Sequence, residues 1–108
     1  MTKISQVKKG TMTVGQKIKE LRESKNMLQR ELASKLEVGD GFLSKVERNQ
    51  KTLKREHLAT ISKIFNFPYT DLETLWLANK VYDLIKDESQ AIKVLKVAEQ
   101  EIKYGKNI

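Results

Sequence analysis

The chain has 108 residues, a formal net charge of +7 and no cysteine, so it is long enough for one domain with an appendage. The lack of cysteine excludes disulfides and thiolate metal sites, and the single histidine, His57, excludes an imidazole-rich zinc site. We therefore expect no cofactor, and no small-molecule ligand is evident. The chain has no run of about 18 apolar residues and no apolar signal-peptide core, which predicts a cytoplasmic protein that does not cross a membrane.

The excess positive charge lies in the first part of the chain. Residues 1–58 contain 14 Lys or Arg against 7 Asp or Glu, whereas residues 59–108 contain 7 of each. A basic surface on one part of a protein indicates a polyanionic partner, and nucleic acid is the first candidate. Lysine-rich solvated helices would give the same asymmetry, so the charge by itself leaves the question open.

Residues 1–12 are polar and basic and have no helical period. We expect an arm that either follows DNA phosphates or is simply a loose start of the chain. Thr13 and Gln16 then match the capping-box pattern, which predicts a helix from Val14 to about Lys25. Asn26 tolerates the left-handed backbone that ends such a helix.

Two short amphipathic segments, Gln29–Glu37 and Asp40–Arg48, flank a tight connection. In each segment the apolar residues share one helical face: Leu32, Ala33 and Leu36 in the first, and Phe42, Leu43 and Val46 in the second. Two helices joined by about three residues cannot pack side by side, so they must cross steeply, as in a helix-turn-helix. Ala33 has the small side chain that a close crossing needs, and Val38 can fill the angle between the helices.

This stretch resembles the phage-repressor or Xre-type helix-turn-helix regulators. The resemblance extends from about Val14 to about Leu75, and the residues that carry it are Gln29, Leu32, Ala33, Leu36, Val38, Leu43, Ser44, Val46, Glu47, Arg48 and Asn49. It implies an all-α fold with a five-helix lambda-repressor-like DNA-binding domain over residues 13–75. It also implies a transcriptional regulator that binds double-stranded DNA sequence-specifically, in which Arg22 pairs with Glu47.

The turn departs from the pattern of the resembled family at two positions. Glu37 stands where a glycine is usual, and Gly39 stands where a Ser or Thr normally caps the recognition helix. Glycine is a weaker cap, and we expect that Asp40 could take over that role.

The candidate DNA-binding residues follow from this placement. Gln29 and Arg30 lie in the first turn of the second helix, where unpaired N–H groups and a partial positive charge suit phosphate. Base edges would meet the outer side of the recognition helix, which carries Asp40, Gly41, Phe42, Ser44, Lys45 and Arg48. Phe42 fits either a thymine methyl group or the core, and Lys45 is the one good donor for guanine. Phosphate contacts are expected from the basic loop that follows, through Asn49, Lys51, Lys54 and Arg55.

The rest of the chain predicts three further helices. The first is Glu56–Phe65, the second runs over Asp71–Lys86 after a capping box of Thr70 and Glu73, and the last ends near Tyr104. Residues 76–108 would form a C-terminal helical hairpin with an apolar face that a small domain cannot cover: Leu77, Val81, Leu84 and Ile85. We expect this extension to form a homodimer, with docking of another protein as the alternative.

The leading interpretation is a homodimeric regulator on a near-palindromic operator. The alternative is an antitoxin-like or protein-interaction module that uses the same fold. The chain has no cysteine, one histidine and no glycine-rich phosphate loop, so no group of residues resembles a catalytic site, and we expect no enzymatic activity.

Overall fold

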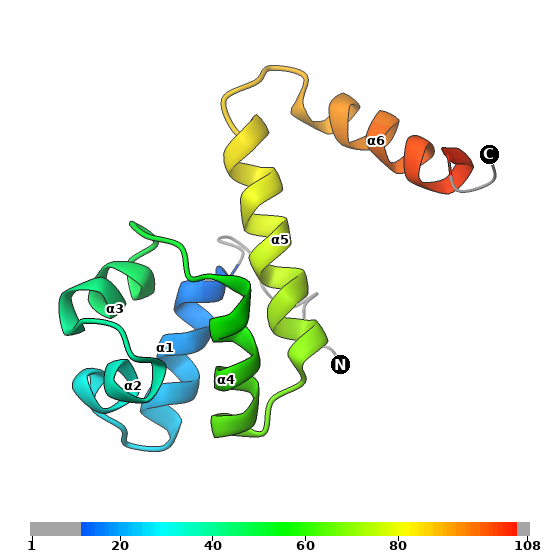
Figure 1. The fold of residues 1–108 in the computed structure, drawn as a ribbon. Helices are drawn as coiled ribbons and strands as arrows, with labels where there is room; N and C mark the ends of the chain where they lie inside the picture. Colours follow the sequence, from blue (N-terminus) through cyan, green and yellow to red (C-terminus); the bar gives the residue numbers. More distant parts are fainter. Residues whose placement is uncertain (1–11, 106–108) are drawn as a thin grey trace.

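The computed structural model describes residues 12–105, and this part of the chain contains six α-helices and no strand (Figure 1). The helices are α1 Val14–Ser24, α2 Gln29–Leu36, α3 Asp40–Glu47, α4 Arg55–Phe65, α5 Tyr69–Ile85 and α6 Ala91–Gly105. Helices α1 to α4 form one body, against which the first half of α5 packs (Figure 1). The all-α class expected from the sequence is confirmed.

Helix α1 begins at the predicted capping box. Thr13 Oγ1 accepts a hydrogen bond from the Gln16 amide at 3.1 Å, and Gln16 Oε1 accepts one from the Thr13 amide at 3.0 Å. The helix ends at Ser24, and Asn26 follows with a φ of 55°, in the left-handed region that its side chain tolerates. Local sequence signals therefore set both ends of α1.

The hydrophobic core lies where the first four helices meet α5. Its fully buried large side chains come from all five helices and from the loop before α4: Ile18, Leu32, Leu43, Leu53, Leu58, Ile61 and Leu72. Burial of a side chain of this size stabilises the fold by roughly 1.5–3 kcal/mol. Because Leu53 is part of this core, the loop between α3 and α4 is anchored to the body of the domain.

Helices α2 and α3 cross at a short turn, as predicted. Ala33 is completely buried at the crossing, and Val38 packs partly buried against the core. The Val38 amide donates a hydrogen bond to the Ala33 carbonyl at 3.0 Å, which closes the turn. Glu37 has a φ of 59°, a left-handed conformation that costs a non-glycine residue roughly 1–2 kcal/mol. The turn thus keeps a geometry that suits glycine, although glutamate occupies the position.

The predicted start of α5 is wrong. The helix begins at Tyr69, directly after Pro68, and the Pro68 carbonyl accepts a hydrogen bond from the Leu72 amide at 3.3 Å. Proline has a fixed φ, −55° here, so it directs the chain into the helix without a side-chain cap. Thr70 therefore lies inside the first turn. Glu73, its expected partner in a capping box, instead accepts a hydrogen bond from the Tyr69 hydroxyl at 3.1 Å.

The N-terminus of α3 also differs from expectation. Gly39 is the N-cap residue and Asp40 is the first residue of the helix, so Asp40 does not take over the capping role. The α3 N-terminus thus has no side-chain cap, and its first N–H groups have no intrahelical partner.

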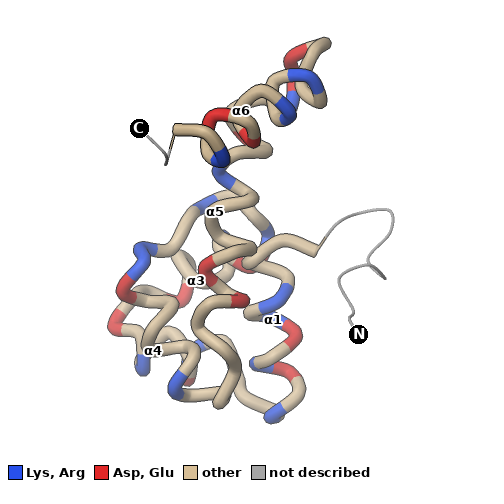
Figure 2. The backbone as a smooth tube through the Cα atoms, turned by 90° about the vertical axis from the view of Figure 1, so that its right-hand side faces the viewer, with Lys and Arg blue, Asp and Glu red and all other residues tan. Residues whose placement is uncertain are grey.

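The C-terminal part of the chain extends away from the body. Helix α5 continues unbroken through Leu75, and α6 leaves its end in a different direction (Figures 1 and 2). No residue of α6 is buried. The predicted apolar face of α5 is confirmed as exposed at Leu77, Val81 and Leu84, but Ile85 is buried with 9% exposure and does not belong to that face.

Candidate nucleic-acid interface

A buried ion pair fixes the end of α3 against α1. Arg22 Nε and Nη2 donate to the two carboxylate oxygens of Glu47 at 2.8 and 3.0 Å, and both residues are buried. Arg22 Nη1 also donates to the Met27 carbonyl at 2.7 Å. The hydrogen bonds to Glu47 raise the pKa of Arg22 above its already high ordinary value, so the guanidinium stays charged. The pairing implied by the resemblance is confirmed.

Gln29 belongs to the same network. From the first residue of α2, Gln29 Nε2 donates to Glu47 Oε1 at 2.9 Å. Glu47 on α3 thus receives hydrogen bonds from both α1 and α2, which fixes the relative orientation of the three helices. The backbone N–H of Gln29 stays at the open N-terminus of α2, where a helix has no intrahelical acceptor for it. Phosphate binding by Gln29 remains a prediction, with its side chain already committed to Glu47.

The outer side of α3 carries five of the six residues predicted to face base edges. Their positions cover about 140° of the helix circumference at 3.6 residues per turn, and four are exposed while Ser44 is half-buried: Asp40, Gly41, Ser44, Lys45 and Arg48. A Cβ on Gly41 would meet no atom within 4 Å, so this side of the helix is open to the approach of another molecule. The opposite side, with Leu43 and Val46, is buried in the core.

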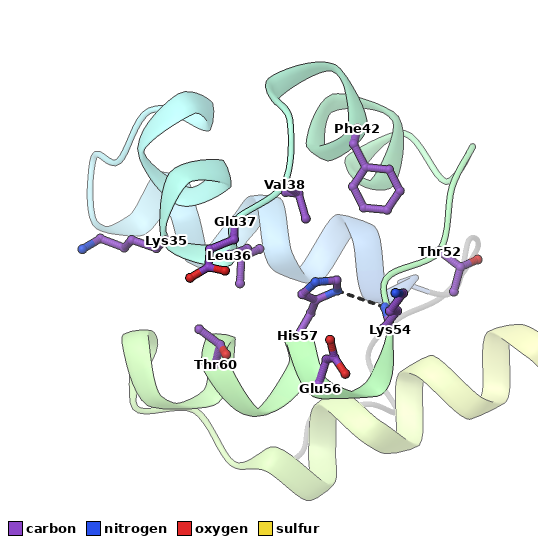
Figure 3. A pocket seen from close by; sticks show the side chains of 10 residues that line it. All are labelled: Lys35, Leu36, Glu37, Val38, Phe42, Thr52, Lys54, Glu56, His57 and Thr60. Carbon is purple, nitrogen blue, oxygen red and sulfur yellow. Dashed lines mark hydrogen bonds between the residues drawn. The ribbon is translucent and has the colours of Figure 1, made fainter.

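Phe42 lies on the core side of α3. Its ring is half-buried against the core. It points into an open groove of about 650 Å³ that lies between the α2–α3 turn and α4 (Figure 3). Of the two alternatives that the sequence left open for Phe42, the structure favours core packing.

His57 on α4 also lines this groove, close to the loop between α3 and α4. His57 Nδ1 accepts a hydrogen bond from the Lys54 amide at 3.1 Å (Figure 3). The imidazole therefore serves the N-terminus of α4, since it provides an acceptor for an N–H group that the helix leaves unpaired. His57 is thus half-buried and has a structural role at the start of α4.

The loop after α3 is held rigidly and presents cations. Asn49, just after α3, has a φ of 66°, a left-handed conformation that asparagine tolerates at the end of a helix. Leu53 is buried in the core, and its carbonyl accepts a hydrogen bond from Trp76 Nε1 at 2.8 Å. Lys51 and Lys54 flank this anchor and are exposed. The loop can thus carry two lysines beside α3 on a backbone that is anchored at Leu53.

Five of the predicted contact residues keep their charges available. These side chains are exposed and form no ion pair with another residue of the described range 12–105: Arg30, Lys45, Arg48, Lys51 and Lys54. An exposed cation without a nearby carboxylate retains its full attraction for phosphate.

Arg55 is placed differently from the other cations. Its Nε lies 3.3 Å from Glu73 Oε2, and its guanidinium carbon lies 5.0 Å from the centroid of the Trp76 ring. Both partners belong to α5, so the side chain ties the start of α4 to α5. The prediction that Arg55 contacts DNA is untested, and this arrangement gives the residue a structural role as well.

Two residues that support the site were not singled out from the sequence. A Cβ on Gly15 would lie 2.1 Å from the Val46 carbonyl oxygen, so only glycine lets α1 approach α3 this closely. Asn79 Oδ1 accepts a hydrogen bond from the Val14 amide at 2.8 Å, which ties the start of α1 to α5. The sequence signal for Gly15 is a glycine inside a helical pattern, and that for Asn79 is a polar residue on the buried face of a helix.

Neither a metal site nor a membrane-spanning helix occurs within residues 12–105. Among residues 12–105, no three His, Cys, Asp or Glu side chains lie where they could hold a metal ion. No helix within that range combines the length and the apolar character needed to cross a membrane.

A family model described as a helix-turn-helix domain matches residues 15–82, which is more than half of the chain. The chain belongs to the helix-turn-helix domain family. No curated protein matches it. Among solved structures, the clp gene regulator ClgR from Corynebacterium glutamicum is similar, with a TM-score of 0.52 and 23% identity over 84% of this chain and 89% of that chain. At this level of identity the similarity shows the fold.

The matched helix-turn-helix domain begins at Gly15 in α1, ends at Tyr82 in α5 and leaves α6 outside. Within the domain, α2 and α3 are the two helices of the helix-turn-helix, and the Arg22–Glu47 pair holds α3 in place. The predicted boundary between a DNA-binding domain and a C-terminal extension falls near Leu75, inside the continuous helix α5. That boundary stays a prediction.

Proposed function

We propose that this helix-turn-helix protein is a transcriptional regulator of the phage-repressor or Xre type that binds double-stranded DNA sequence-specifically. The single observation that carries the proposal is the open outer side of α3, which the Arg22–Glu47 pair holds from behind and which is flanked by cations that form no ion pair within residues 12–105. A rigid helix with an exposed face and neighbouring positive charges fits the major groove of B-DNA, which admits one α-helix.

In this arrangement the residues divide into two groups by their chemistry. Lys45 on α3 is the donor for guanine O6 and N7, with Arg48 as a second cation at the C-cap of α3, while Asp40 can accept a hydrogen bond from cytosine N4. Lys51, Lys54 and the N-terminus of α2 with Arg30 would bind phosphates on either side of the groove. Because the base-facing group has few donors, we infer that DNA shape contributes to the choice of sequence.

The protein is proposed to bind its operator as a homodimer. Exposed apolar side chains are concentrated on the second half of α5 and on α6, and such a surface usually marks an interface. A two-fold axis there would place two α3 helices on one side of the assembly. Successive major-groove half-sites lie about 34 Å apart, so the operator should be a near-palindrome with half-sites roughly one turn apart. Residues 1–11 of the basic arm, which is expected either to follow DNA phosphates or to be a loose start of the chain, lie outside the described residues.

Selection of bound genomic fragments by the full-length protein would test the proposal. Recovery of a shared near-palindromic sequence, bound far more tightly than a scrambled duplex at the same salt concentration, would support it. Recovery of random fragments, with affinity that disappears as salt is raised, would show only non-specific attraction to phosphate. That result would favour the alternative function, a protein-interaction or antitoxin-like module, which the exposed apolar surface of α5 and α6 also fits.

A further inference from the structure

The outer face of α5 is an apolar surface without a cover in the described chain. Leu77, Val81 and Leu84 follow one another at spacings of four and three residues, so they lie on one side of the helix. They are 41%, 43% and 77% exposed. The opposite side of α5 packs on the body through Leu72 and Trp76. The face therefore points away from the domain.

Helix α6 carries a second uncovered apolar stripe. Val94, Leu95 and Ile102 lie on one side of α6 with two alanines, and they are 43%, 42% and 61% exposed. Lysines occupy the opposite side of the helix, at positions such as Lys93 and Lys96. This amphipathic pattern is typical of a helix that packs against a protein surface.

Within one chain, α6 does not cover the face of α5. The turn after Ile85 sends α6 away from α5, and two views at right angles both place α6 beyond the end of α5 (Figures 1 and 2). No residue of α6 is buried. Both stripes are therefore available to a second molecule.

The size and charge of the two stripes fit each other. Leu77 and Leu84 are seven positions apart on α5 and Val94 and Ile102 are eight apart on α6, so at 1.5 Å per residue both stripes are about 10–12 Å long. Lys80 borders the face of α5, and Glu101 borders the stripe of α6. When the stripes meet, these opposite charges lie at the edge of the contact.

We propose that two copies of this chain exchange their C-terminal arms, so that α6 of each copy packs on the Leu77–Val81–Leu84 face of the other. The proposal rests on the homodimer of the proposed function and specifies which surfaces form it. Because each α6 crosses to the other copy, the arms fix the relative placement of the two domains and hence of the two α3 helices. The partner is a second copy of this chain.

The chain has no native cysteine, which allows a direct test by cross-linking of the full-length protein. One chain carries Val81→Cys, and a second, longer tagged chain carries Leu95→Cys. Both sites are less than half exposed on their stripes, and unchanged thermal melts would show that the variants fold. The two chains are mixed, allowed to exchange, and treated with a short bismaleimide in the absence of DNA.

Arm exchange predicts that the mixed pair gives a covalent heterodimer, and that it forms roughly tenfold faster than either chain links to itself, since packed side chains have a high effective concentration. A matched control mixes Lys63→Cys with Leu95→Cys. Lys63 is exposed on α4, on the body of the domain, and this pair should not link. A chain with both Val81→Cys and Leu95→Cys should form linked dimers and no internally linked monomer.

Three results would overturn the exchange. Faster self-linking of either single variant would indicate symmetric pairing of α5 with α5 or of α6 with α6. An internal link in the doubly substituted monomer would show that α6 folds back on its own α5, and no linking at tens of micromolar would leave no dimer. Because no DNA is present, failure of the DNA-binding proposal would leave these outcomes unchanged, so the two proposals can fail separately.

Discussion

Gly15 in α1 lies directly against the carbonyl oxygen of Val46 in α3: a Cβ at Gly15 would stand 2.1 Å from that oxygen and 2.9 Å from Asn49 Oδ1. The nearest atom belongs to the backbone, which cannot move aside as a flexible side chain can. The absence of one side chain therefore sets how closely α1 supports the end of the proposed recognition helix.

Gly15→Ala should destabilise the fold because α1 and α3 must separate to admit the methyl group. We expect a loss of about 1–3 kcal/mol, the usual cost of overpacking, measured as the free energy of unfolding in urea. Gly41→Ala is the matched control, since a Cβ there meets nothing within 4 Å and alanine favours a helix. Equal unfolding midpoints for the two variants would contradict the close contact.

Loss of one partner of the Arg22–Glu47 pair should cost more than loss of both. Arg22→Met or Glu47→Leu alone leaves a buried charge without its partner, which typically costs roughly 3–5 kcal/mol. The double variant removes both charges and should recover much of that loss. Thermal melts and urea titrations of the three variants measure the coupling, and losses that simply add would argue against the pair as a unit.

Lys45 and Lys51 should have different effects on DNA binding. Lys45→Ala is expected to cost roughly 1–3 kcal/mol on the selected operator and little on random duplex, because Lys45 is proposed to bind a base edge from α3. Lys51→Ala should weaken binding to both duplexes and reduce the salt slope by about one, as loss of one phosphate contact does. Each variant is the control for the other in DNA titrations at several salt concentrations. If Lys45→Ala lowered the affinity for operator and for random duplex by the same factor, Lys45 would be a phosphate contact and not a base contact.

Glu37→Gly should stabilise the protein. Glycine removes the strain of the left-handed backbone at position 37, which stabilises the folded state by roughly 1–2 kcal/mol. Glycine also gives the unfolded chain more conformational freedom, which offsets roughly 0.5–1 kcal/mol of that gain. The expected net gain in the free energy of unfolding in urea is between about 0 and 1.5 kcal/mol. Ser34→Gly, at an exposed position inside α2, has no such strain to relieve and should be slightly destabilising. A lower midpoint for Glu37→Gly would show that the glutamate side chain itself stabilises the turn.

The sequence by itself determined the elements whose signals are local. A capping box depends on residues three apart, an amphipathic face on spacings of three and four, and a left-handed helix end on a single asparagine. The ends of α1, the helix-turn-helix and the end of α3 were therefore predictable from short windows of sequence. The Arg22–Glu47 pair, 25 residues apart, could be predicted only because the stretch resembles a known family.

Only the tertiary structure decided which side chains meet across the fold. The close approach at Gly15, the hydrogen bond from Gln29 to Glu47, and the attachment of Arg55 to α5 depend on contacts between segments that no local window contains. The same holds for Phe42, whose spacing fits either the core or the groove side, and for Ile85, which a helical pattern alone places on the exposed face. Helix periodicity fixes the direction of a side chain around its own axis, whereas its surroundings depend on how the helices pack, and that packing is a property of the whole chain.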